Sequence, residues 1–418
     1  MIKLPHKRTE IRLSREDAII AYCARLDLDN ERRASIKQQI NEGVDWELLL
    51  YRAGWQRLSP LVSYHLVSPD MNMLVPELVR KKLQNILFMS LARNMLLQDE
   101  LSNILAVLNK EEIPVVLLKG AALLQDVYTD IAVRPMSDLD IMVKPENMNR
   151  AENILLKQGY EYSEEYILKY RHSNLWNRRK GIMLEVHRHI VDSDSPYNLE
   201  LEDFWARARC IKVKNNDALV LSPEDTMIHL SINFLSDRRF YSNSALGQLV
   251  DLSELILHYN DSLRWNLIEQ IAINFKFTTG LHCVLYACAQ LLSSQIPVTV
   301  MQCLRPRDFN PEVANLFFRQ RVLECKPWLA HNLVPPQVTY SPNEVIRSII
   351  SRFLHVLTGD LKGKQSRMSN WSFYLRRVKE ILPRVGRVIF RPSELREDLL
   401  LDRWLHNMYN SGRGPQVR

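Results

Sequence analysis

The sequence predicts an α+β protein in which a small mixed β-sheet core is embedded in helical N- and C-terminal regions. Three observations support this fold class. Glycine accounts for only 12 of 418 residues, and a chain of long helices with few tight turns needs little glycine. Apolar residues recur at three- and four-residue spacing over most of the chain, as in amphipathic helices. Short, β-branched apolar runs gather between residues 111 and 192, which places the sheet there.

The length of the chain favours two or three packed units over one core. The patterns divide it into four regions of different expected character: a helical N-terminal region (1–110), the sheet core (111–192), a helical domain packing on the core (193–340), and a basic, mostly helical C-terminal region (341–418).

The core has the expected order αβαβαββ. A two-residue hydrophobic period or a continuous apolar run predicts its strands, and a helical period predicts the segments between them. The expected strands are 114–118, 137–143, 170–176 and 182–189, the expected helices 121–128 and 145–159, and a hairpin turn is expected at 179–181.

Charge is distributed unevenly. The net charge is +7, yet from Ser341 onward 15 Lys and Arg stand against 7 Asp and Glu, a net +8. A basic region of this kind contacts nucleic acid or another anionic partner, or it is an ordinary solvated surface. The sequence leaves both interpretations open.

No part of the sequence indicates a membrane span or an export signal. No apolar run approaches the ~18 residues that a membrane helix needs, and no apolar stretch follows the basic N-terminus as a signal peptide would require. The six cysteines form no CxxC pair, so we expect reduced thiols. These features predict a cytoplasmic protein.

Two aspartates interrupt an apolar strand. Asp138 and Asp140 are two residues apart, so a strand places both carboxylates on one face. Like charges at that spacing repel unless a cation lies between them. Mg²⁺ prefers such hard oxygen ligands and commonly shares them with substrate phosphates. We therefore predict that both aspartates bind metal.

A third acid lies on a later predicted strand. Glu185 and His187 share one face of it, opposite apolar neighbours. If this strand lies beside the aspartates, Glu185 completes the metal site or acts as the general base towards an acceptor hydroxyl. His187, and His172 on the preceding strand, are candidates to contact the acceptor, or they are hydrogen-bonding walls of the site.

A phosphate-binding turn is predicted at Lys119-Gly120. Glycine between a strand and a helix lets backbone N–H groups approach a phosphate, and the helix directs its positive end there. Lys119 and Arg134 add two cations for a triphosphate. Asp251 interrupts an apolar helix face. It is expected to pair with a neighbouring cation, with a substrate role as the alternative.

These motifs resemble a known family. The segments concerned are Leu117-Leu118-Lys119-Gly120-Ala121-Ala122-Leu123, Tyr128, Arg134-Pro135-Met136-Ser137-Asp138-Leu139-Asp140-Ile141-Met142-Val143 and Leu184-Glu185-Val186-His187. Together they are similar to the signature of the uncharacterised bacterial nucleotidyltransferase-like family of the polymerase β-type superfamily, and looser similarity covers most of the chain. The resemblance implies chemistry with an NTP and Mg²⁺ on a five-stranded mixed sheet flanked by helices.

One position departs from the wider superfamily, which has Gly-Ser where this chain has Gly120-Ala121. Ala121 therefore offers the phosphates no hydroxyl. The resemblance implies nucleotidyl transfer from an NTP, with ATP expected and with Mg²⁺ or Mn²⁺, to an acceptor that the sequence does not identify. The alternatives are transfer to a protein side chain or an RNA end, and a catalytically silent scaffold that binds a partner or a nucleotide.

Overall fold

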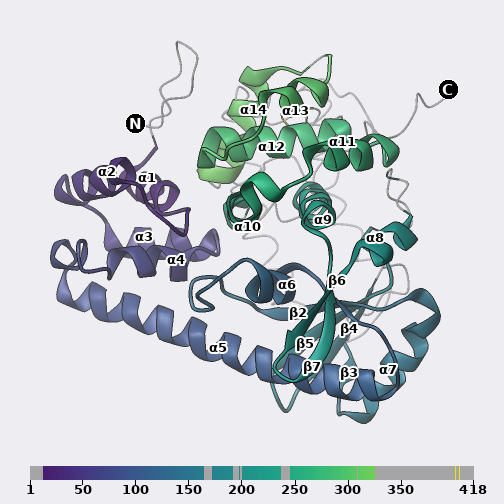
Figure 1. The fold of residues 1–418 in the computed structure, drawn as a ribbon. Helices are drawn as coiled ribbons and strands as arrows, with labels where there is room; N and C mark the ends of the chain where they lie inside the picture. The colour runs from purple at the N-terminus through teal and green to yellow at the C-terminus, as the bar shows by residue number, and fades with distance from the viewer. Residues whose placement is uncertain are drawn as a thin grey trace, which may run out of the picture.

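The computed structural model describes residues 13–163, 172–191, 197, 200–236, 245–307, 309–324, 401 and 404. Figure 1 shows a mixed sheet at one end of a long helix, with N-terminal helices at the other end of that helix and later helices above both. The predicted α+β fold class is confirmed.

The N-terminal region is helical, as predicted. Its elements are α1 (Arg15–Tyr22), α2 (Asn30–Asn41), α3 (Trp46–Trp55), α4 (Ser59–Leu66), the 3₁₀ turn η1 (Asn72–Leu74) and α5 (Glu77–Lys110). Side chains of Ser14, Asp29 and Asp45 accept hydrogen bonds from the first turns of α1, α2 and α3, which satisfies N–H groups left open at a helix start. α5 reaches from α4 to the sheet, where it packs on β2, β6 and β7.

The sheet has seven strands in the order β3-β4-β5-β2-β1-β7-β6. β2 is parallel to β5 and β1 is parallel to β7, whereas the other neighbours are antiparallel. The strands are β1 (Val116–Leu117), β2 (Asp138–Met142), β3 (Glu161–Tyr162), β4 (His172–Asn177), β5 (Ile182–His187), β6 (Arg209–Val213) and β7 (Asn216–Val220).

The sheet is larger than the five strands that the resemblance implied. β6 and β7 form a hairpin beyond residue 192, where we expected the core to end and helices to resume. Their alternation is hard to recognise because β6 is a half-exposed edge strand with polar residues. The turn itself carried a sequence signal, since two asparagines follow Lys214 and asparagine favours turns. In the structure Lys214 adopts a left-handed φ of 54° at this turn. The division into four regions stays a prediction.

The remaining helices flank the sheet or lie above it (Figure 1). They are α6 (Lys119–Asp126), η2 (Pro145–Asn147), α7 (Met148–Lys157), α8 (Leu201–Arg207), α9 (Pro223–Ser236), α10 (Ala245–Tyr259), η4 (Asn260–Ser262), α11 (Trp265–Asn274), α12 (Thr278–Leu292), α13 (Val298–Cys303), α14 (Pro311–Phe317) and the π-helical turn η5 (Phe318–Leu323). α9, α10 and α12 pack on one another. α6 follows β1, and its first residues belong to the site described below.

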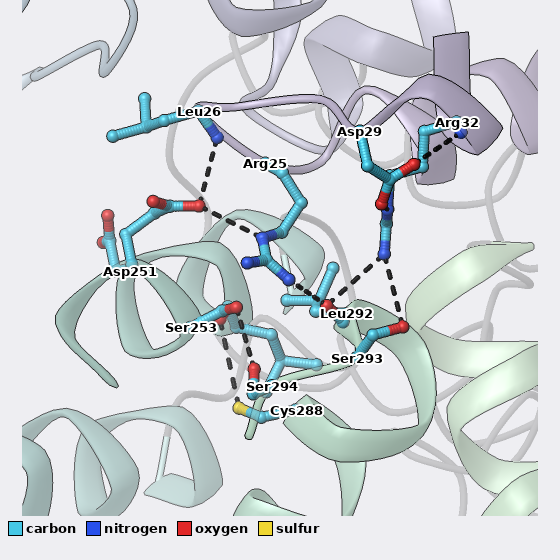
Figure 2. A network of polar contacts seen from close by, with 12 residues as sticks. Arg25, Leu26, Asp29, Arg32, Asp251, Ser253, Cys288, Leu292, Ser293 and Ser294 are labelled. Carbon is cyan, nitrogen blue, oxygen red and sulfur yellow. Dashed lines mark hydrogen bonds and ion pairs between the residues drawn. The ribbon is translucent and has the colours of Figure 1, made fainter. Parts of the chain in front are cut away.

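Two arginines of the N-terminal region form hydrogen bonds with the later helices (Figure 2). Arg25 Nη1 and Arg32 Nη2 both donate to the carbonyl of Leu292, at the end of α12. Cations there offset the negative end of the helix. Glu254 of α10 accepts the backbone N–H of Leu26 at 3.1 Å. The N-terminal helices therefore have a fixed position relative to α10 and α12.

Within the described part of the chain, no helix combines the length and hydropathy that a membrane span requires. Of the basic region 341–418, only Leu401 and Trp404 are described, so its predicted helices and charged surface lie outside the described residues. The five described cysteines are free thiols.

Candidate functional site

The three predicted acids come from two neighbouring strands. β2 and β5 are parallel, and their register places Asp140 opposite Glu185 and Asp138 opposite Met183. Because residues two apart share a strand face, all three carboxylates lie on the same face of the sheet. The expectation that the Glu185 strand lies beside the aspartates is confirmed.

Lys119 lies between two of these acids. Its Nζ is 2.6 Å from Asp140 Oδ1 and 3.3 Å from Glu185 Oε2. Lys119 is the first residue of α6, and its φ of 45° falls in the left-handed region that non-glycine residues rarely adopt. This backbone conformation occurs where β1 turns into α6. The cation predicted for phosphate therefore contacts the acids from the start of α6.

Two histidines border the same acids. His187 is buried, and its Nε2 lies 3.0 Å from Asp140 Oδ1 and 3.3 Å from Glu185 Oε2. His172 is paired with His187 across β4 and β5. Its Nε2 lies 4.0 Å from Glu185 Oε2, and the two imidazole rings are 4.7 Å apart. The structure therefore brings both histidines to Glu185.

The pKa values of the three acids are shifted in different directions. Burial raises the pKa of Asp138, and the neighbouring charges of Asp140 and Glu185 raise it further. Burial also acts to raise the pKa of Asp140, but Lys119 and His187 outweigh it and lower that pKa. The same two partners lower the pKa of Glu185 against its own burial. Asp138 is thus the acid with the least compensated charge.

Arg134 and Asp251 form a separate ion pair. Arg134 donates from Nε to Asp251 Oδ1 at 2.8 Å and from Nη2 to Oδ2 at 2.7 Å. The hydroxyl of Tyr128 donates to Asp251 Oδ1 at 2.7 Å. The expectation that Asp251 pairs with a neighbouring cation is confirmed. Two donors of Arg134 are thereby engaged by protein.

The glycine of the predicted phosphate turn has a packing role as well. A Cβ on Gly120 would collide with Arg134 Nη1 and would lie 2.9 Å from Met136 Sδ. Ala121 is buried in the first turn of α6, and no side chain caps that helix start. Contact of these residues with phosphate stays a prediction.

An open cleft joins the two clusters. It encloses about 620 Å³, counting the open solvent at its mouth. The lining combines residues of α6, of β2 and of the loop between them with residues from the surrounding helical regions: Arg57, Lys119, Gly120, Arg134, Pro135, Met136, Ser137, Asp138, Asp140, Leu230, Asn233, Gln248 and Asp251. The helical regions therefore complete a site that begins in the sheet.

Sequence reasoning missed three polar members of this lining: Arg57, Asn233 and Gln248. Arg57 follows α3, is exposed, and donates from Nη2 to Ser137 Oγ at 2.7 Å. Ser137 in turn donates to Asp138 Oδ1 at 2.9 Å. No local pattern marks Arg57, because it reaches the cleft only through packing of distant helices.

The acids fit a divalent cation. Asp138, Asp140 and Glu185 supply hard oxygen ligands of the kind that Mg²⁺ takes. The raised pKa of Asp138 reflects burial first and then repulsion from the other two acids, and a bound cation would relieve that repulsion. The donor chemistry of these three acids therefore suits Mg²⁺, and Mn²⁺ accepts the same donors. In this structure the ammonium of Lys119 contacts two of them, Asp140 and Glu185.

Comparisons with known proteins identify a family over more than half of the chain. Residues 42–293 match a family described as uncharacterised nucleotidyltransferase. A search of curated proteins found no significant match. Among solved structures, the chain is similar to an antigenic nucleotidyltransferase-like protein from Paracoccidioides brasiliensis, at 15% identity and a TM-score of 0.31, over 49% of this chain and 96% of that one.

Proposed function

Because the chain belongs to the uncharacterised nucleotidyltransferase family, we propose that it transfers a nucleotidyl group from an NTP to an acceptor, with Mg²⁺ held by Asp138, Asp140 and Glu185. The observation that carries the proposal is the convergence of three carboxylates, from two paired strands, beside an open cleft. Bound Mg²⁺ would neutralise phosphate charge and polarise the reacting phosphoryl group. Mn²⁺ would serve in its place.

In the proposed reaction, an acceptor oxygen attacks the α-phosphorus in line. A new P–O bond forms while the bond to the departing pyrophosphate breaks, and the acceptor proton passes to a base. Glu185 either takes that proton or completes the metal site. Positioning and charge neutralisation would supply most of the rate.

The cations of the cleft would hold the triphosphate. Lys119 lies at the start of α6, whose positive end suits an anion. Arg57 lines the cleft next to Ser137. Arg134 would act chiefly by keeping the loop that precedes Asp138 in place, since Asp251 engages two of its donors. Gly120 and Ala121 would offer backbone N–H groups.

We propose ATP as the NTP, and the acceptor is a small molecule, a protein side chain or an RNA end. His187, His172 and Asp251 are the candidates for acceptor contact or for supporting the acids. The basic region 341–418, with its net +8, is proposed to contact nucleic acid or another anionic partner.

A catalytically silent scaffold is the second candidate. It is favoured by Ala121, which leaves the turn without a hydroxyl, and by Lys119, whose ammonium contacts two of the acids. In this alternative the protein binds a nucleotide or a partner without turnover.

Mass spectrometry separates the two candidates. The purified chain is incubated with Mg²⁺, each of the four NTPs, and pools of small molecules, proteins and RNA. Transfer adds the mass of one nucleoside monophosphate to an acceptor and releases pyrophosphate, and both signals are absent with the Asp138→Asn/Asp140→Asn double variant. Mass gain that persists in the double variant would contradict the assignment of the acids, and nucleotide binding without any product would favour the scaffold.

A further inference from the structure

A second set of metal-ligating atoms lies beside the proposed Mg²⁺ site. One ligand atom from each of His172, Glu185 and His187 lies within 4.8 Å of the others. The set is built by strand pairing, since His172 and His187 are opposite each other on β4 and β5 and Glu185 precedes His187 by two residues on the same face. None of the three belongs to the lining of the cleft.

The distances suit one small ion between the three side chains. Two ligands about 2.1 Å from a tetrahedral ion lie about 3.4 Å from each other. Glu185 Oε2 is 3.3 Å from His187 Nε2 and 4.0 Å from His172 Nε2. The second separation is too long for a hydrogen bond between those atoms. Small side-chain shifts would therefore place all three around one ion.

The chemistry of the donors selects the class of ion. Two imidazole nitrogens and one carboxylate oxygen suit borderline transition ions. Affinity for such a set rises from Mn²⁺ to a maximum at Cu²⁺ and is lower again for Zn²⁺. Mg²⁺ prefers oxygen donors and retains much of its water. The three all-oxygen ligands Asp138, Asp140 and Glu185 and this mixed set therefore differ in the metal they favour, although they share Glu185.

We propose that His172, Glu185 and His187 bind one divalent transition ion, with Zn²⁺ favoured over Mg²⁺. The site goes beyond the proposed transferase function, because it requires neither an NTP nor turnover. When occupied, it would hold the carboxylate of Glu185, and so it links transition-metal binding to the third acid of the proposed Mg²⁺ site.

Calorimetric titration of the full chain with Zn²⁺, after removal of metals with a chelator, tests the site. We expect one Zn²⁺ per chain that millimolar Mg²⁺ does not displace. Replacement of the half-buried ligand, His172→Asn, should weaken binding by about 100-fold or more, because loss of even an outer partner of a metal ligand costs 10–100-fold. The control His258→Asn alters an exposed histidine of α10 and should bind Zn²⁺ like the wild type.

Two further measurements identify the ligands. The Asp138→Asn variant should keep Zn²⁺ binding, whatever happens to nucleotide transfer, so failure of the transferase proposal would leave this one standing. Co²⁺ used as a probe should give a spectrum without thiolate absorption, which excludes the exposed Cys210 and Cys303. The proposal is overturned if His172→Asn and Glu185→Gln, folded by circular dichroism, bind Zn²⁺ as the wild type does, or if Co²⁺ shows thiolate ligation.

Discussion

Two charged clusters contribute residues to one cleft, and their charges are arranged differently. In the cluster of Arg134, Asp251 and Tyr128, one guanidinium meets one carboxylate through two hydrogen bonds, and a hydroxyl satisfies the same carboxylate. In the cluster around Asp140 and Glu185, the ammonium of Lys119 contacts both of these acids, and Asp138 adds a third carboxylate. The first cluster is balanced and the second has an excess of acid.

The difference teaches which cluster stabilises the fold and which serves chemistry. An ion pair whose hydrogen bonds are all made holds two elements of the fold together. Here these two elements are α10 and the loop that precedes β2. Several acids that are wholly or partly buried in one place destabilise the folded chain unless something binds there, and groups with perturbed pKa values gather at functional sites. We infer that the Arg134–Asp251 pair positions the site and that the acids carry its function.

The largest effect on stability is expected when a substitution breaks the Arg134–Asp251 ion pair. Asp251→Ala leaves the guanidinium of Arg134 buried without its carboxylate, which typically costs roughly 3–5 kcal/mol of unfolding free energy. Urea unfolding measures this loss. The matched control is Asp70→Ala, which removes an exposed partner of Arg33 and should cost no more than about 1 kcal/mol. An equal loss of unfolding free energy in both variants would mean that the Arg134–Asp251 pair does not stabilise the fold.

Glu185→Gln should affect activity in the cluster with excess acid. If Glu185 ligates Mg²⁺, nucleotide binding and rate fall together. If it is only the base, binding survives and the rate falls by roughly 10²–10⁴, with partial recovery at higher pH because a more ionised acceptor needs less help. Transfer kinetics and nucleotide titrations distinguish the two. Wild-type rate and affinity in this variant would remove Glu185 from the site.

Gly120→Ala should disturb the contact between the two clusters. The added methyl group meets Arg134 Nη1 and Met136 Sδ. Because two hydrogen bonds to Asp251 hold Arg134 in place, its side chain does not move aside freely, and overpacking costs roughly 1–3 kcal/mol. Gly54→Ala in α3 is the control, because its Cβ would only reach Ser59 Oγ at 3.5 Å, and it should be neutral or slightly stabilising. Thermal unfolding compares them, and an unchanged melting temperature for Gly120→Ala would contradict the close packing.

The smallest effect concerns Asp138. Its pKa is raised in the folded chain, so the folded state binds the proton more tightly, and stability falls as pH rises from the unfolded-state pKa through the folded-state pKa. Asp138→Asn removes this penalty and should raise the melting temperature at pH 7 by roughly 1–4 °C. The gain should disappear as pH falls towards 3.8, the ordinary pKa of an aspartate.

Scanning calorimetry across that pH range checks the prediction in the absence of metal. The control is Asp217→Asn, whose side chain is 79% exposed and which should show no gain. A melting temperature for Asp138→Asn that is lower than the wild type at pH 7 would show that Asp138 is compensated in the folded chain.

The sequence predicted the parts of the site that depend on local periodicity. A two-residue period placed Asp138 and Asp140 on one strand face, and the same period aligned Glu185 with His187. Contacts between segments that are distant in the sequence could not be predicted from local periodicity. Arg57 reaches Ser137 across 80 residues of sequence, and no local pattern records such a contact.

The β6–β7 hairpin was missed for a related reason. Its strands are short, β6 lies at the edge of the sheet, and part of its surface is exposed, so the hydrophobic alternation that marks a strand is weak. The position of Lys119 was also unexpected. A strand followed by Lys-Gly predicts a phosphate turn, but the left-handed φ that brings the ammonium to Asp140 depends on the surrounding fold.

Calorimetric titration of Mg²⁺ and ATP into wild-type and Asp140→Asn protein tests the central claim most directly. If the acids with excess charge hold the cation, the wild type binds ATP only with Mg²⁺ present, and Asp140→Asn weakens binding by about tenfold or more while the protein stays folded. Asp217→Asn, an exposed aspartate on β7, should bind like the wild type. Equal affinity of the wild type and Asp140→Asn for Mg²⁺ and ATP would contradict the account.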